Sequence, residues 1–67
     1  MLKIGDVIKI HGTQYRILAD DNTHFCLNNL EEGGCIRFYG WKQSVLYSDS
    51  DIVKRLIEDD ITAGRCG

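Results

Sequence analysis

The chain has 67 residues, of which 43% are hydrophobic and 27% are charged, and its net charge is −2. This length allows a single domain, residues 1–67, and the composition excludes a disordered chain. No apolar run approaches the roughly 18 residues of a membrane helix, and the first residues lack the apolar core and cleavage site of a signal peptide. We therefore expect a cytoplasmic protein without membrane contact.

The charges are unevenly distributed along the chain. Residues 1–47 hold five acidic and five basic side chains, whereas residues 48–67 hold five acidic and three basic ones. Neither part has the excess of basic residues that dominates the affinity of proteins for nucleic acid. Cysteines are odd in number, at Cys26, Cys35 and Cys66, whereas small secreted domains usually carry an even disulfide framework. This favours reduced thiols.

The segment from Asp6 to Leu18 alternates apolar and polar residues, which is typical of half-buried strands. Gly12 and Thr13 stand midway, and glycine tolerates the positive φ of a tight turn. With these two residues as the loop, the predicted cross-strand pairs are Ile10 with Tyr15, Lys9 with Arg16, and Ile8 with Ile17. The predicted inner face carries Ile8, Ile10, Tyr15 and Ile17. The predicted outer face carries Val7, Lys9, His11, Gln14, Arg16 and Leu18.

A second hairpin is predicted after a turn at residues 20–23. Its strands cover residues 24–29 and 35–39, and residues 31–34 form the connecting turn. A two-residue loop places Phe25, Leu27, Ile36 and Phe38 on the inner face. It places His24, Cys26, Cys35, Arg37, Tyr39 and Trp41 on the outer face. A three-residue loop would exchange the faces of the second strand, and the outward charge of Arg37 favours the first register.

Residues 43–47 are predicted to add one more short strand, and a helix follows over about residues 49–62. Ser48 is the predicted N-cap, with Asp51 three residues later. The apolar residues of this helix recur at helical spacing and predict a buried stripe. They are Ile52, Val53, Leu56, Ile57 and Ile61. Gly64 is the expected terminator, and residues 64–67 are the expected flexible tail.

These elements predict an α+β domain, with four or five short antiparallel strands within residues 4–47 and one C-terminal helix. Such a meander either curls into a small barrel or stays open with the helix across it. The run Gly5 to Ile10, with Gly12 and the strand Tyr15 to Leu18, resembles the first hairpin of SH3-like small barrels. The resemblance implies that fold and no function, because the chain has no acidic loop followed by a tryptophan pair of the kind that grips Pro-rich peptides.

No catalytic, cofactor or metal site is predicted. The cysteines lack the close spacing of zinc ligands, and the two histidines, His11 and His24, are far apart in the sequence. Cys26 and Cys35 lie on adjacent strands but are not opposite each other, which disfavours a disulfide. No serine has evident histidine and carboxylate partners, and no glycine-rich phosphate loop is present.

The outer sheet face is the predicted binding surface. Aromatic and arginine side chains are typical of protein interfaces, and aromatic rings beside cations also stack bases and hold phosphates. The candidate residues are Arg37, Tyr39, Trp41 and Lys42, with Lys9 and Arg16 as a second group. We expect a non-enzymatic interaction protein whose partner is another protein, with nucleic acid as the alternative. Tyr39 and Trp41 packing under the helix is the competing structural interpretation.

Overall fold

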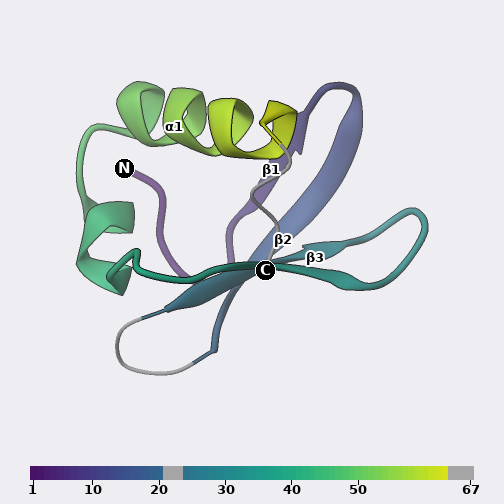
Figure 1. Cartoon of the computed structure of the whole chain (residues 1–67), viewed down its shortest axis with the longest axis horizontal. Helices are drawn as coiled ribbons and strands as arrows, with labels where there is room; N and C mark the ends of the chain where they lie inside the picture. Colours follow the sequence, from purple (N-terminus) through teal and green to yellow (C-terminus); the bar gives the residue numbers. More distant parts are fainter. Residues whose placement is uncertain (21–23, 64–67) are drawn as a thin grey trace.

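The computed structural model describes residues 1–20 and 24–63. Four strands, β1 (Val7–Ile10), β2 (Thr13–Ala19), β3 (Phe25–Asn29) and β4 (Cys35–Phe38), form an antiparallel sheet in the order β1-β2-β3-β4 (Figure 1). A 3₁₀-helix, η1 (Gln43–Tyr47), and an α-helix, α1 (Ser50–Thr62), follow. The α+β meander with a C-terminal helix is therefore confirmed.

The sheet does not close into a barrel, so the SH3-like expectation fails at this point. Its two outer strands, β1 and β4, have four residues each and do not pair with each other. An open sheet must bury its apolar face against another layer. Here α1 crosses the sheet and supplies that layer (Figure 1).

The first hairpin turns at His11 and Gly12, one residue earlier than predicted. Both residues have positive φ, 50° and 81°, as a two-residue type I′ turn requires. The observed pairs are therefore Ile10 with Thr13, Lys9 with Gln14, Ile8 with Tyr15 and Val7 with Arg16. The register differs from the predicted one by two residues. An even shift keeps every strand side chain on its predicted face. His11, which was predicted on the outer face, lies in the turn instead, and its Nε2 is 3.2 Å from the Thr62 Oγ1 of α1.

This register separates two cations that were expected to be directly opposite each other. Lys9 faces Gln14, and Arg16 faces Val7. Lys9 and Arg16 are thus diagonal neighbours, for which Cα atoms lie roughly 7–8 Å apart. The predicted like-charge pair is wrong, although both side chains stay on the outer face.

The second hairpin has a four-residue loop, residues 30–33, instead of two. The Asn29 amide donates to the Gly34 carbonyl at 2.9 Å, and the Asn29 side-chain oxygen accepts from the amides of Glu31 and Glu32 at 2.9 Å each. Phe25 pairs with Phe38, and Leu27 with Ile36. Because four and two are both even numbers, the longer loop leaves the side chains of both strands on the same faces. The predicted inner face, with Phe25, Leu27, Ile36 and Phe38, is therefore confirmed.

Residues 43–47 do not form the predicted strand. They form η1, in which the Val45 amide donates to the Lys42 carbonyl at 3.0 Å. Gly40 has a φ of 84°, which ends the extended backbone that leads out of β4, and within residues 1–20 and 24–63 no further strand pairs with β4 beyond β3. Leu46 is fully buried in the core, and its packing outweighs the strand propensity of the segment.

Helix α1 covers nearly the predicted range but is capped by Asp49 instead of Ser48. The Asp49 carboxylate accepts from the amides of Asp51 and Ile52, at 2.9 and 3.3 Å. Asp49 thereby satisfies two of the orphan amides of the first turn. The predicted terminator Gly64 and the tail lie outside the described residues.

Only one of two apolar strips on α1 faces the core. Val53 and Ile57 are fully buried and Ile61 is half-buried. Ile52 and Leu56 keep 58% and 40% of their surface exposed, so their predicted burial is wrong. Residues four apart share a helix face, and the five apolar residues make two adjacent rows. The sheet contacts the row that contains Val53 and Ile57.

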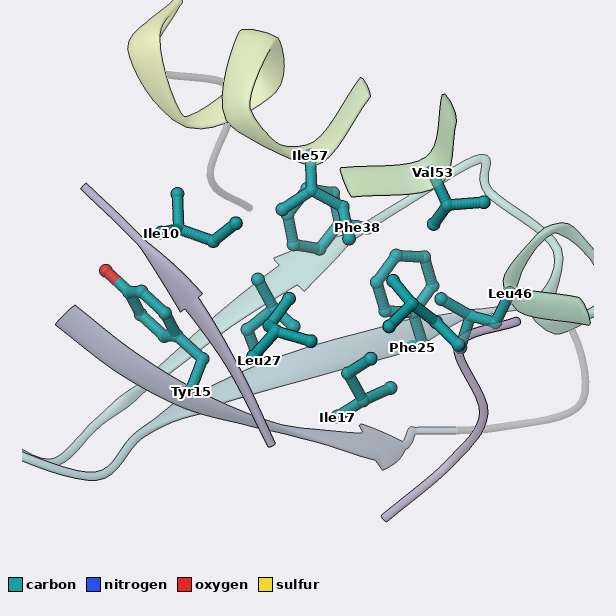
Figure 2. Packing of buried hydrophobic residues seen from close by; sticks show 11 residues of the cluster. Ile10, Tyr15, Ile17, Phe25, Leu27, Phe38, Leu46, Val53 and Ile57 are labelled. Atoms are coloured by element: carbon teal, nitrogen blue, oxygen red, sulfur yellow. The ribbon is translucent and has the colours of Figure 1, made fainter. Parts of the chain in front are cut away.

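The core lies between the inner sheet face and the two helices. Figure 2 shows Val53 and Ile57 pointing from α1 toward Phe25 and Phe38, whose rings stack with centroids 4.8 Å apart. The buried apolar cluster contains Leu2, Ile8, Ile10, Tyr15, Ile17, Phe25, Leu27, Phe38, Leu46, Val53 and Ile57. Within the described ranges, no helix has the length and hydropathy to cross a bilayer.

Candidate interaction surfaces

The sheet face opposite the core is uncovered by any described helix. We call it the open face and define it by the strand residues that alternate with the core residues. They are Val7, Lys9, Gln14, Arg16, Leu18, Cys26, Asn28, Cys35 and Arg37. Most of these side chains are exposed, and Cys26 is the buried exception. Three of the nine are cationic, and none is a carboxylate.

The cations of the open face differ in their surroundings. The Arg37 guanidinium lies 3.4 Å from the Asp20 carboxylate at one end of the sheet, in an ion pair that remains solvent-exposed. Lys9 and Arg16 form no ion pair within residues 1–20 and 24–63. The acidic residues of α1 belong to the other layer. The Glu31 carboxylate also approaches this layer, where it accepts from the Gln14 amide at 2.8 Å. Three cations thus stand beside two carboxylates, Asp20 and Glu31, so the open face of a chain of net charge −2 keeps a small excess of positive charge.

Two aromatic rings extend this face beyond the ends of β3 and β4. His24 and Tyr39 form an edge-to-face pair with ring centroids 5.2 Å apart. Tyr39 is 57% exposed and follows Arg37 by two residues along the chain. Tyr39 therefore stays a candidate on the outer side, as predicted.

Trp41 does not share the open face. Its ring lies 5.8 Å from the rings of both Phe25 and Phe38, which belong to the core, and it is half-buried. The predicted outward position assumed that strand alternation continues past Tyr39. The positive φ of Gly40 ends that alternation. The competing interpretation, in which Trp41 packs beside the core, is correct for this residue.

Trp41 and Lys42 instead line a shallow groove, which we call the Trp41 groove. Its volume is ≈ 370 Å³, and it lies between residues 40–45 and α1. The lining residues are Gly40, Trp41, Lys42, Ser44, Val45 and Leu56. Sequence reasoning missed this groove because it assigned Leu56 to the core. The predicted site thus divides between the open face, with Lys9, Arg16, Arg37 and Tyr39, and the groove, with Trp41 and Lys42.

The two described cysteines are free thiols on the open face. Cys26 pairs with Arg37 and Cys35 pairs with Asn28, so the thiols are on a diagonal. Burial, and next the neighbouring Cys35 thiol, raise the pKa of the Cys26 thiol, which therefore stays protonated at neutral pH. No cluster of three or more potential metal ligands is present in the described part of the chain. Cys66 lies outside that part.

Comparison with protein-family models, curated proteins and solved structures finds no match to this chain.

Proposed function

We propose that this chain is a non-enzymatic interaction protein that binds an anionic surface of a partner protein through its open face. One observation carries the proposal. All nine strand side chains on that face are cationic, polar uncharged or apolar, although the chain as a whole is acidic. Complementary charge steers association and selects partners.

The mixed chemistry of the open face favours a protein partner. Val7 and Leu18 place apolar surface between the cations, and Tyr39 and Arg37 are residue types enriched among interface hot spots. Lys9 and Arg16 have no carboxylate partner in the described part of the chain. A partner carboxylate can therefore pair with either cation without displacing an existing ion pair.

Nucleic acid is the second candidate for the same face. The His24–Tyr39 ring pair stands beside Arg37, and exposed rings next to cations stack bases and hold phosphates. The ion pair of Arg37 with Asp20 and the net charge of −2 reduce the attraction for phosphate. Protein is the better supported partner because the exposed apolar surface of Val7 and Leu18 suits a protein interface and not phosphate binding.

The test is affinity capture from an extract of the cells that make the protein, with the Lys9→Glu/Arg16→Glu double variant beside the wild type. Reversal of both cations should reduce recovery of an acidic partner by about tenfold or more, because like charges then face each other across the interface. Nuclease treatment of the extract should leave recovery unchanged.

The matched control is Lys54→Glu/Arg55→Glu, which makes the same charge change on α1. It should capture the partner as the wild type does, and circular dichroism must show that both variants are folded. Equal recovery by all three proteins would refute the proposal. Loss of the captured material after nuclease treatment, with binding that weakens steeply as salt rises, would establish the nucleic-acid candidate instead.

A further inference from the structure

The Trp41 groove exposes apolar surface on a side of the molecule that the open face does not include. Leu56 lines it from α1, and Trp41 and Val45 line it from the segment between β4 and α1. Ile52, one turn before Leu56 on the same strip of α1, extends the apolar surface with 58% of its own area exposed. Contiguous apolar surface of this kind marks binding sites in small proteins.

Two lining residues of the groove carry side-chain groups that only donate hydrogen bonds, the Lys42 ammonium and the Trp41 indole N–H. The Lys42 ammonium forms no ion pair or hydrogen bond with any part of the described chain. Nothing in residues 1–20 and 24–63 accepts a hydrogen bond from the Trp41 indole N–H. This N–H reaches solvent, since no described buried side-chain nitrogen lacks a partner.

No carboxylate is among the lining residues, so nothing in the lining neutralises Lys42. A ligand that matches these walls needs an apolar side chain to fill the space between Trp41 and Leu56. It also needs a carboxylate to accept from Lys42. A charge-assisted hydrogen bond of this kind is about twice as strong as a neutral one.

We infer that the Trp41 groove binds a short segment of a partner protein in which a bulky apolar side chain stands next to a carboxylate. The inference does not rest on the function proposed for the open face, because the groove shares no residue with that face.

The experiment begins with a random 12-residue peptide library displayed on phage and panned against the immobilised full chain. Enriched peptides that lack tryptophan are synthesised and titrated while the emission of Trp41, the single tryptophan, is followed. We expect the enriched peptides to share an apolar residue beside Asp or Glu, and their binding to shift the Trp41 emission.

Two variants locate the binding site, and a third is the matched control. Leu56→Asp should weaken binding by about tenfold or more, because it removes an apolar wall and places an anion beside the peptide carboxylate. Lys42→Glu should weaken binding by about fivefold.

Leu30→Asp changes a leucine of similar exposure, 38% against 40%, in the β3–β4 loop and should leave affinity within about twofold. The Lys9→Glu/Arg16→Glu variant should also bind the peptides normally.

Four results would overturn the inference: no enrichment in panning, unchanged binding to Leu56→Asp, enriched peptides without acidic residues, or a groove occupied by a second copy of the chain. Sedimentation equilibrium detects the last case as a dimer that Leu56→Asp converts to a monomer. Failure of the inference in any of these ways would leave the charge-reversal test of the open face unaffected.

Discussion

Ile57→Ala should lower the free energy of unfolding by about 2–5 kcal/mol, whereas Ile52→Ala should change it by less than about 0.5 kcal/mol. Both residues are isoleucines of α1, so replacement by alanine changes the intrinsic helix propensity by the same amount in the two variants. Ile57 is fully buried against the sheet, and Ile52 is 58% exposed. Only Ile57→Ala therefore leaves a cavity in the core.

Urea denaturation followed by far-ultraviolet circular dichroism measures both changes. The total stability expected for so small a domain is about 5 kcal/mol, so Ile57→Ala should retain about 3 kcal/mol or less. Ile57→Val, which should cost about 0.5–1.5 kcal/mol, then supplies a variant that stays folded. An equal loss at the two positions would contradict the observed orientation of α1, in which only the strip with Val53 and Ile57 is buried.

Phe38→Ala should have the second large effect, a loss of about 3–5 kcal/mol. The Phe38 ring stacks on Phe25 at 4.8 Å and contacts Trp41 at 5.8 Å, so its removal opens a cavity and breaks two aromatic contacts. Offset-stacked and edge-to-face rings contribute beyond their buried area. Chemical denaturation followed by Trp41 emission measures this loss directly.

Tyr39→Ala is the matched control for Phe38→Ala, since it removes the next aromatic residue along the chain. Tyr39 is mostly exposed, so the free energy of unfolding should stay within about 0.5 kcal/mol of the wild type. The Trp41 emission maximum of the folded protein should shift in Phe38→Ala if that variant stays folded, and should not shift in Tyr39→Ala. A stable Phe38→Ala variant with unchanged emission would contradict the packing of Phe38 against Phe25 and Trp41.

The two faces of the sheet could be predicted from sequence because side chains alternate with a period of two. The exact register could not, because it depends on which two residues turn. His11 takes the positive φ of the first turn position, a conformation that non-glycine residues rarely adopt. The sequence pattern favoured Gly12 and Thr13 instead. The pairing of the first hairpin is shifted by two residues, and the loop of the second is two residues longer than predicted. Both numbers are even, so the strand side chains of the inner face were predicted correctly.

The helix could be predicted from its apolar spacing, but its orientation could not. Two adjacent apolar rows satisfy the same helical periodicity, and only packing against the sheet distinguishes Val53 and Ile57 from Ile52 and Leu56. Similarly, extrapolating strand alternation through Gly40 placed Trp41 on the wrong side. A glycine that follows a strand is where such extrapolation should stop. Because Leu56 was predicted to be buried and Trp41 was predicted on the outer sheet face, the Trp41 groove was not predicted.

The most direct test of the binding account is amide chemical-shift mapping of the ¹⁵N-labelled chain as the captured partner is added. If the open face is the interface, the largest perturbations should fall on β1, β2 and β4, around Lys9, Arg16 and Arg37. The amides of α1 between Asp51 and Glu58 should move little. Perturbations confined to α1, or spread evenly over both layers of the fold, would contradict binding through the open face.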